Sequence, residues 1–435
     1  MNSENAIDDI FKQQKAWFYA GKTRDLAVRL AALRKLKEVI FQHRQHIYTA
    51  LESDLGKTPE IVDRVEIGAV VEEIDSALEG LAQWARDDVF MLSGTLAGSE
   101  GRICREPFGV CYVIGPFNYP FNLTLTPLVG AIAAGNTAIL KPSEATPEPS
   151  KIIKKIIDLS FPPAYVAVVE GGRKENELLL AKPFDFYFFT GSPQVGKIVM
   201  KAAAEQLAPV VLELGGKCPV VVFDDADIDH LIERLLFAKY LNSGQTCVAP
   251  DYLLVPEDRH DEIVSRLTAR VAAAYGQQSL GKIVNSRHIQ KLAGYLQQTR
   301  GNVETGGEYS EATRQFSATV VSRVGWDDAL MQEEIFGPIL PVVTYRDLTE
   351  CRENIIRYHA RPLALYIFSR DTEKALSFIK TVQSGDAQIN DIMTHVLSSE
   401  LPFGGIGPSG IGKYHGKFSF DIYSHVRSIR TVRAS

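Results

Sequence analysis

The chain has 435 residues, of which 45% are hydrophobic and 23% charged, and its formal net charge is −6. These values are close to the averages of globular proteins, so they exclude a mainly disordered, collagen-like or coiled-coil protein, and the length suffices for two or three domains. The acidic balance does not favour nucleic acid as a partner. Five cysteines are too few for a disulfide scaffold, and their odd number leaves at least one thiol unpaired within the chain.

The N-terminal sequence, MNSENAIDDIFKQQ, lacks the basic and apolar regions of a signal peptide. No stretch reaches the roughly 18 apolar residues that a membrane-spanning helix needs. We therefore expect a cytoplasmic protein without a membrane span.

The chain has two successive regions with different patterns of apolar residues. Apolar residues recur every three or four positions over residues 25–51, and Gly and Pro are rare up to about residue 85, which predicts helices. From residue 108, short β-rich runs alternate with helical stretches such as residues 150–159, 194–207 and 229–241. This alternation predicts an α/β fold with a parallel sheet and helices on both faces. The expected strands are residues 108–115, 136–144, 164–172, 184–192, 210–216, 218–223, 251–256, 337–345 and 364–369.

Two further segments lack an obvious core of their own. Residues 88–105 are polar and rich in glycine, and we expect a hairpin that leaves the first domain. Residues 418–435 alternate between apolar and polar side chains, which favours a strand. Either segment suits an intersubunit contact or a plain surface arm.

Cys247 lies in NSGQTCVAP, after a helix expected to end near residues 242–244. A loop can present a thiol as a nucleophile, and nearby positive dipoles can lower a thiol pKa from about 8.5. A buried, unreactive cysteine is the alternative interpretation, and it is the one we assign to the other four cysteines.

Glu213 and Asn118 also follow strand-like runs. Glu213 ends the apolar run VVLELGG, where a carboxylate is either paired or has a raised pKa that suits a general base. Asn118 stands between aromatic residues and prolines in GPFNYPF, where a fixed amide can donate to an oxyanion or simply form a turn.

The turn FTGSPQVGK joins a predicted strand to a predicted helix. Ser192 suits the N-cap and Pro193 the first helical position, and the N–H groups at such a helix start can bind a pyrophosphate. Gly191 and Gly196 are five residues apart, so G-x-G-x-x-G is absent. Ile198 replaces the Ser or Thr that a magnesium-binding P-loop needs, which argues against an ATPase.

Other catalytic classes find little support. The histidines are scattered, and neither H-E-x-x-H nor C-x-x-C occurs, so we expect no metal site. Residues 407–410, Gly-Pro-Ser-Gly, are one residue short of a serine hydrolase elbow, and no strand precedes them.

Taken together, residues 20–428 resemble the aldehyde dehydrogenase superfamily, and most closely its class 3, which includes fatty and aromatic aldehyde enzymes. The motifs occur in order. They are GPFNYPFNLTLTPLVGAIAAGNTAILKPSE, FTGSPQVGK, LELGGK, NSGQTCVAPDY, MQEEIFGPILPVV and LPFGGIGPSGIGKYHGKFSFDIYSH. One departure is Phe117, where the family usually has Trp.

The resemblance implies a role for each matching residue. Cys247 matches the nucleophile, Glu213 the general base and Asn118 the oxyanion-hole amide. The residues that match cofactor-binding positions are Lys141 and Glu144 for the adenosine ribose, Gly191, Ser192 and Gly196 for the pyrophosphate, and Glu334 and Phe336 for the nicotinamide ribose.

The resemblance further implies a Rossmann-like fold divided into three parts and a homodimer. The implied parts are an NAD(P)-binding domain at residues 1–85 and 106–213, a catalytic domain at 214–415, and a bridging element for oligomerisation at 86–105 and 416–435. The cofactor is expected to be NAD or NADP, with NAD slightly favoured because the Glu144 carboxylate would repel a 2′-phosphate.

The implied reaction oxidises an aldehyde to the carboxylic acid through a cysteine thiohemiacetal and thioester, and Glu213 activates the hydrolytic water. Transfer of the acyl group to coenzyme A or phosphate is one alternative, although such relatives usually lack this glutamate. A non-catalytic structural protein on the same fold is the other. Aromatic and apolar residues near the expected pocket, Tyr119, Phe121, Leu397 and Phe403, favour a medium- or long-chain aliphatic aldehyde or an aromatic one.

Overall fold

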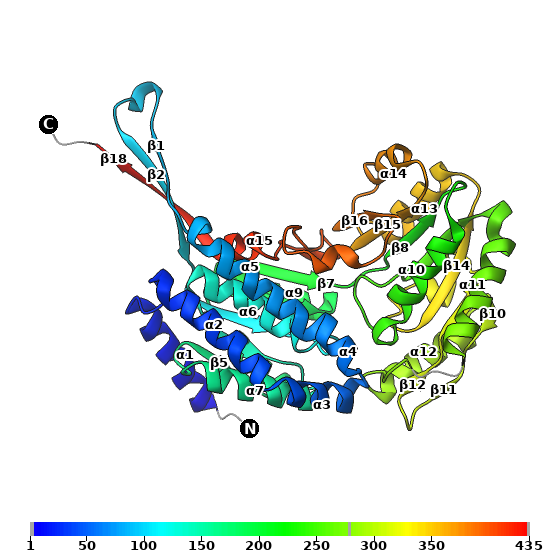
Figure 1. Cartoon of the computed structure of the whole chain (residues 1–435), viewed down its shortest axis with the longest axis horizontal. Coiled ribbons are helices and arrows are strands. Elements are labelled where there is room, and N and C mark those ends of the chain that lie inside the picture. The colour runs from blue at the N-terminus through cyan, green and yellow to red at the C-terminus, as the bar shows by residue number, and fades with distance from the viewer. Residues whose placement is uncertain (1–3, 277–279, 433–435) are drawn as a thin grey trace.

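The computed structural model describes residues 4–276 and 280–432 (Figure 1). The N-terminal region is helical, as the 3–4 periodicity predicts; of its residues, only 1–3 lie outside the described part. Its elements are α1 (Glu4–Tyr19), α2 (Leu26–Gln42), α3 (Arg44–Leu55), α4 (Pro59–Val62), the π-helical turn η1 (Asp63–Ile67) and α5 (Gly68–Trp84). In the described residues, no helix is long and apolar enough to cross a membrane.

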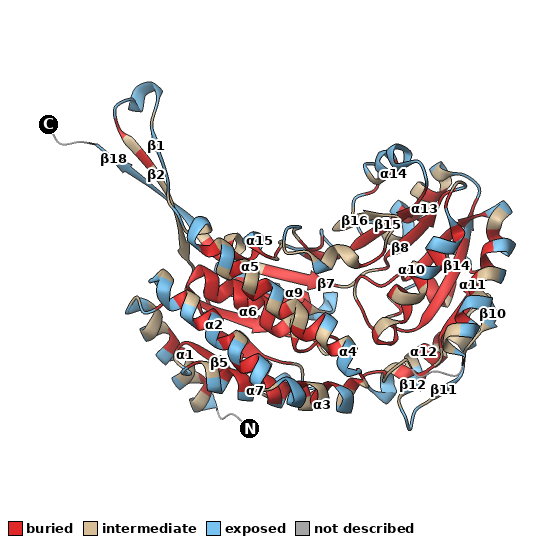
Figure 2. Ribbon diagram, in the orientation of Figure 1, coloured by how far each residue is buried: buried red, intermediate tan, exposed pale blue. Residues whose placement is uncertain are grey.

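The first sheet has six strands in the order β17-β7-β6-β3-β4-β5, and all neighbours pair in parallel except β17 with β7. The strands are β3 (Val110–Ile114), β4 (Thr137–Lys141), β5 (Val166–Val168), β6 (Phe186–Gly191), β7 (Val210–Leu214) and β17 (Gly410–Ile411). The helices that follow these strands are α6 (Asn122–Ala134), α7 (Pro147–Ser160), α8 (Arg173–Leu180) and α9 (Pro193–Glu205). Because helices cover it, the strand interior is almost entirely buried (Figure 2).

The second sheet has seven strands in the order β10-β13-β14-β9-β8-β15-β16, parallel except between β10 and β13. Its strands are β8 (Pro219–Val222), β9 (Tyr252–Pro256), β10 (Asn302–Thr305), β13 (Thr319–Ser322), β14 (Ile339–Tyr345), β15 (Ala364–Phe368) and β16 (Asp386–Ile389). The accompanying helices are α10 (Ile228–Tyr240), α11 (His260–Tyr275), α12 (Ser286–Gln298), α13 (Leu348–His359) and α14 (Thr372–Ile379).

A third, antiparallel sheet projects from the body as an arm (Figure 1). It consists of β1 (Asp88–Met91), β2 (Glu100–Pro107) and β18 (Ser424–Thr431). The predicted hairpin is thus confirmed. The C-terminal strand predicted over residues 418–435 is confirmed for Ser424–Thr431, but it is wrong for residues 418–422, which are helical, and residues 433–435 lie outside the described part. The helix α15 (Lys417–Ile422) precedes β18 and packs against α5 and α6.

The predicted fold class, an α/β protein with parallel sheets and a small β element, is confirmed. Every strand expected from a β-rich run is present. The strands that were not expected are the buried β13 and five strands with little apolar signal: β10, β16, β17 and the hairpin β11 (Tyr309–Ser310) and β12 (Gln315–Phe316). The remaining short helical turns are η2 (Gly94–Leu96), η3 (Leu241–Gly244), η4 (Glu257–Arg259), η5 (Ala329–Met331) and η6 (Thr394–Leu397).

A buried arginine joins the N-terminal helices to the first sheet layer. The Arg29 guanidinium of α2 donates to the backbone carbonyls of Thr23 (2.8 Å), Arg24 (2.9 Å) and Ala133 (3.2 Å). A Cβ atom at Gly135, whose φ is +96°, would lie 2.8 Å from the Arg29 Cζ. The glycine therefore makes room for the guanidinium, which satisfies one carbonyl at the end of α6 and two before the start of α2.

Replacing Arg29 with Met should lower the free energy of unfolding by about 2–3 kcal/mol, because three carbonyls lose a charged donor. The measurement is the midpoint of urea-induced unfolding. Arg270→Met is the matched control, since Arg270 is exposed on α11, and it should leave the midpoint nearly unchanged. An equal effect of both substitutions would contradict this account.

Candidate active site

The parallel pairing of the first sheet brings the carboxyl ends of four strands to one edge. Ile114 in β3 lies beside Lys141 in β4, and Thr190 in β6 lies beside Glu213 in β7. Ligands of open α/β sheets bind in the crevice at this edge. The residues predicted from the sequence that lie at or just after these strand ends are Asn118, Lys141, Glu144, Gly191, Ser192, Gly196 and Glu213.

Cys247 approaches from the second domain, on the loop between η3 and β9. Asn242 and Ser243 have left-handed backbones, with φ of 53° and 55°, so the helical path of α10 ends there, as predicted. The Asn118 Nδ2 atom donates to the Gln245 carbonyl at 3.0 Å. This hydrogen bond joins the loop after β3 to the chain two residues before the cysteine.

The surroundings of Cys247 disfavour its thiolate. Burial raises the pKa of Cys247 to about 12, and the carboxyl groups of Glu334 and Glu213 contribute in the same direction. The backbone N–H groups of Cys247 and Val248 act the other way, because they donate to the sulfur. Without a bound ligand the thiol is therefore protonated near neutral pH and needs a proton acceptor or a nearby positive charge to react.

Glu213 is buried, and in the described part of the chain neither of its carboxyl oxygens has a hydrogen-bond partner. Burial raises the pKa of Glu213 well above the ordinary carboxyl range, while the Lys413 ammonium partly offsets this effect. A Cβ atom at Gly404 would lie 2.8 Å from Glu213 Oε1, so the glycine leaves space beside the carboxyl. A buried, unpartnered carboxyl of this kind is suited to accept a proton from water.

Glu334 and Phe336 come from the segment between η5 and β14. A Cβ atom at Gly215 would lie 1.9 Å from Glu334 Oε2, so the absence of a side chain there admits the carboxyl. Burial is the main cause that raises the pKa of Glu334 to about 8. Phe336 has φ of 53°, and its ring meets the Phe117 ring edge-on at 5.7 Å. Both residues thus lie close to loops that leave the first sheet.

Lys141 and Glu144 form an ion pair at the end of β4. The Lys141 side chain is buried and donates to Glu144 Oε2 at 2.9 Å, whereas the Glu144 side chain is 57% exposed. The carboxylate thus stays available to hydroxyl groups of a ligand while the ammonium holds it in place.

Ser192 caps α9, which begins at Pro193 as predicted, and its Oγ accepts from the Val195 N–H at 3.4 Å. A Cβ atom at Gly196 would lie 2.7 Å from Leu214 Cδ2, so this glycine lets the helix start pack closely on β7. The helix start therefore lies at the carboxyl edge of the sheet, where its dipole favours an anion.

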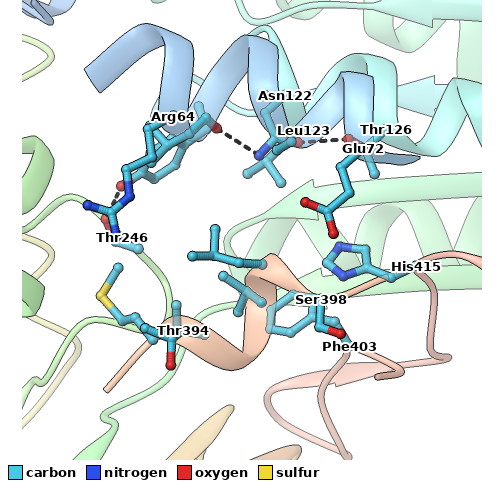
Figure 3. A pocket seen from close by; sticks show the side chains of 18 of the residues that line it. Arg64, Glu72, Asn122, Leu123, Thr126, Thr246, Thr394, Ser398, Phe403 and His415 are labelled. Atoms are coloured by element: carbon cyan, nitrogen blue, oxygen red, sulfur yellow. Dashed lines mark hydrogen bonds between the residues drawn. The ribbon is translucent and has the colours of Figure 1, made fainter. Parts of the chain in front are cut away.

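A cavity of about 410 Å³ lies beside Cys247. Figure 3 shows that η1 and the start of α5, the start of α6 and the segment around η6 surround it. Its wall is mostly apolar, and the lining includes Leu123, Phe237, Leu241, Val248, Met393, Val396, Leu397, Phe403 and Tyr414. Arg64 and Glu72 also line it and have exposed side chains, so they mark its solvent end.

Three of the four residues that we expected near the pocket do line this cavity: Tyr119, Leu397 and Phe403. The prediction is wrong for Phe121, which is fully buried in the core at the start of α6. Its neighbour Asn122 lines the cavity instead. The sequence offers no periodic signal in GPFNYPFNL that distinguishes the two directions, because the prolines interrupt the pattern.

Several residues of the site were not anticipated from the sequence. Arg64 reaches the cavity because the π-helical turn η1 shifts the register between α4 and α5. Lys57 and Glu66 form a buried ion pair behind the wall of the cavity, with Lys57 Nζ 2.6 Å from Glu66 Oε1. A lysine and a glutamate nine residues apart in a helical region gave no motif that would have identified this pair.

Comparisons with known proteins agree with the fold and the site. The sequence model of the aldehyde dehydrogenase family matches residues 1–429. A 4,4′-diaponeurosporen-aldehyde dehydrogenase of Staphylococcus aureus is 43% identical over 429 residues, which cover 98% of this chain and 93% of that one. The dimeric NADP-preferring aldehyde dehydrogenase of Rattus norvegicus is 40% identical, with coverage of 98% and 94%.

Solved structures of aldehyde dehydrogenases have the same fold as this chain. The substrate-bound state of a Staphylococcus aureus AldH has a TM-score of 0.95 and 42% identity, and the match covers 100% of this chain and 95% of that one. A Mycobacterium tuberculosis aldehyde dehydrogenase complexed with NAD+ has a TM-score of 0.90 and 25% identity, with coverage of 99% and 90%.

The fold is that of an α/β oxidoreductase, and the loop of Cys247 meets the loop that follows β3 of its first sheet. The chain belongs to the aldehyde dehydrogenase family, and the predicted class of NAD(P)-dependent aldehyde dehydrogenase is confirmed. The residues present fit such a cofactor, because an exposed carboxylate, a buried ammonium and a capped helix start share one edge of the sheet.

Replacing Glu334 with Gln should lower the pKa of Cys247, because Glu334 contributes the largest charge effect that raises it. With a pKa of about 8, Glu334 is ionised at the higher pH values where the thiol titrates. The measurement is the rate of iodoacetamide alkylation of Cys247 in the cofactor-free protein between pH 7 and 11. We expect the rise in rate to begin at lower pH in the variant, and an unchanged profile would contradict this electrostatic account.

Proposed function

We propose that this chain oxidises an aldehyde to the carboxylic acid, with Cys247 as nucleophile, Asn118 as oxyanion donor and Glu213 as base. The observation that carries the proposal is the hydrogen bond from Asn118 Nδ2 to the Gln245 carbonyl, at 3.0 Å. A side-chain amide has two N–H groups, so one fixes the amide beside the cysteine loop and the other stays available to an oxyanion.

The sequence of steps follows from these groups. The Cys247 thiol loses its proton to solvent, its sulfur adds to the aldehyde carbon, and the carbonyl oxygen becomes an oxyanion that accepts from the Asn118 amide. Bound NAD(P), which Lys141, Glu144 and the start of α9 would hold, would supply the acceptor for the hydride. A thioester on Cys247 remains, and Glu213 removes a proton from the water that hydrolyses it. Preorganised donors of this kind contribute about 3–4 kcal/mol each to the stabilisation of the oxyanion.

Glu213 favours hydrolysis over the alternative of acyl transfer. Its carboxyl is buried and, in the described part of the chain, has no hydrogen-bond partner, so it can accept a proton from water. Acyl transfer to coenzyme A or phosphate needs no such base. Product analysis separates the two: free acid supports the proposal, and acyl-coenzyme A as the product would contradict it.

Replacing Cys247 with Ala should abolish formation of reduced cofactor, because no thiohemiacetal can form. Replacing Asn118 with Ala should lower kcat/KM by about 10²–10³-fold through loss of the oxyanion donor. Stopped-flow absorbance of the reduced nicotinamide measures both with a panel of short, long and aromatic aldehydes. Full activity of the Cys247 variant would refute the assigned nucleophile.

Replacing Glu213 with Gln should leave the first turnover intact and slow the steady state by about 10²–10⁴-fold. In the wild type the steady-state rate should rise with pH as Glu213 loses its proton, because burial raises its pKa. The base form is therefore lost as pH falls through that raised pKa. The variant should show a pre-steady-state burst of reduced cofactor, and its steady-state rate should not depend on pH. Absence of the burst would contradict the assignment of Glu213 to thioester hydrolysis alone.

The cavity favours an apolar substrate with an extended or aromatic body. Its wall combines leucine, valine, phenylalanine and methionine side chains, and its charged lining groups with exposed side chains are Arg64 and Glu72, at the solvent end. The Staphylococcus aureus relative is named for an aldehyde of the diaponeurosporene type. We therefore propose medium- or long-chain and aromatic aldehydes as substrates, for which kcat/KM should exceed that for acetaldehyde.

For the cofactor, we propose that both NAD and NADP serve, with NAD slightly favoured. The Glu144 carboxylate repels a 2′-phosphate, but the Lys141 ammonium at 2.9 Å partly neutralises it. Replacing Glu144 with Gln should raise kcat/KM for NADP relative to NAD. Glu148→Gln is the matched control, because this glutamate pairs with Lys151 instead. An unchanged NADP-to-NAD ratio would exclude Glu144 as a discriminator.

We also propose that the arm forms the contact of a homodimer. Apolar side chains are exposed on it, and the most exposed are Met91 at 66% and Val426 at 64%. The Rattus norvegicus relative is named dimeric. Analytical ultracentrifugation tests this, since a monomer at micromolar concentration would contradict it.

A further inference from the structure

We propose that Lys57 is a positioning residue for the oxyanion donor: its buried ammonium holds the Asn118 backbone so that the Asn118 amide faces Cys247. This inference rests on the proposed function. It assigns a task to a residue that lies nine positions before Glu66 and outside every motif of the sequence.

The contacts of Lys57 converge on one peptide. Lys57 Nζ donates to the Asn118 carbonyl at 2.7 Å and to Glu66 Oε1 at 2.6 Å. It also lies 4.0 Å from the centre of the Tyr119 ring. The ammonium thus contacts two consecutive residues, Asn118 and Tyr119. The Tyr119 hydroxyl in turn forms a hydrogen bond with Oγ1 of Thr246 at 2.7 Å, and Thr246 directly precedes Cys247.

The same carbonyl accepts a second hydrogen bond from the other domain. Asn242 Nδ2 donates to the Asn118 carbonyl at 3.0 Å and to the Gln245 carbonyl at 3.2 Å. The Asn118 amide also donates to the Gln245 carbonyl. The backbone carbonyl and the side-chain amide of Asn118 are therefore both held by hydrogen bonds, and Lys57 provides a charged donor to the carbonyl.

Glu66 keeps the ammonium in place. Its second oxygen, Oε2, accepts from the Asn122 N–H at 2.9 Å, at the first residue of α6. Lys57 and Glu66 are both buried, with side-chain exposures of 1% and 0%. Burial disfavours both charges, and the ion pair with its added hydrogen bonds offsets that cost. Lys57 is absent from the lining of the cavity, so a substrate there does not touch it.

The segment that carries Lys57 is itself tied to the second domain. The Lys282 N–H donates to the Leu55 carbonyl at 2.9 Å, and Gln245 Nε2 donates to the Lys282 carbonyl at 3.0 Å. Hydrogen bonds therefore link Lys57 to Asn118, Asn118 to Gln245, Gln245 to Lys282 and Lys282 to Leu55, which lies two residues before Lys57 in the chain. Loss of the ammonium should let the Asn118 amide move by a fraction of an ångström, which is enough to weaken an oxyanion contact.

The test is a double-mutant cycle between Lys57→Met and Asn118→Ala. The readout is the single-turnover rate of reduced-cofactor formation, because this step includes oxyanion formation. We expect Lys57→Met to slow this step by about 10-fold to 100-fold when Asn118 is present, and by less than about threefold when Asn118 is already Ala. The aldehyde concentration at half-maximal rate should stay within about threefold, since Lys57 does not contact the cavity.

Lys15→Met is the matched control, because Lys15 also forms an ion pair, with Asp185 at 2.7 Å, but on α1 and away from the cysteine loop. It should leave the single-turnover rate unchanged in either background. Effects of Lys57→Met that are equal in both backgrounds would overturn the positioning role and indicate a general loss of structure.

If Lys57→Met does not fold, the charge-neutral pair Lys57→Met with Glu66→Met replaces it, since an apolar pair often substitutes for a buried ion pair without loss of stability. Failure of both variants to fold, while Lys15→Met folds, would assign Lys57 to stability alone and overturn the proposal. If the wild type oxidises no aldehyde, the proposed function fails first, whatever the cycle shows.

Discussion

The site depends on the parallel pairing of β4, β3, β6 and β7. Parallel strands end at the same edge, so residues that are up to about 100 positions apart in the sequence meet there without any long-range signal in the side chains themselves. The proposed base and most of the proposed nucleotide-binding groups come from these strand ends. The proposed nucleophile, Cys247, comes from the second sheet, as do Glu334 and Phe336, and it reaches the edge because left-handed residues at Asn242 and Ser243 end α10.

A second physical factor, low solvent access, determines the acid–base state of the site and the apolar character of the cavity beside it. Burial is the main cause of the raised pKa values of Cys247, Glu213 and Glu334. The same exclusion of water gives the cavity beside Cys247 its apolar wall. These buried groups are therefore neutral at rest, and the proposed nucleophile and base, Cys247 and Glu213, must each lose a proton before they can act.

Much of the fold was predictable because local patterns and tertiary structure agree. The β-rich runs become fully buried strands, and the Ser192-Pro193 pair begins α9 as capping rules predict. The candidate site residues were found through motifs, since a lone Cys247 or Glu213 has ordinary structural explanations. The structure joins two of them, because the Asn118 amide donates to the Gln245 carbonyl, two residues before Cys247.

What the sequence did not reveal depends on contacts between distant segments. Phe121 and Asn122 are neighbours, yet the fold turns the first into the core and the second into the cavity. Short strands such as β16 and β17 carry few apolar residues and exist because a longer strand offers them an edge. Lys57 gave no signal for the same reason, because its partner Asn118 is 61 residues away.

The two domains meet where the proposed oxyanion donor and nucleophile lie, so their relative position enters the chemistry directly. Apolar packing alone would hold the domains together, but small shifts of the Asn118 amide would then cost little free energy, because dispersion contacts are not directional. Hydrogen bonds from Lys57 and Asn242 to one carbonyl restrict that amide in direction as well as distance. A buried ion pair contributes little net stability compared with apolar residues, which argues that its retention here serves the geometry of the site.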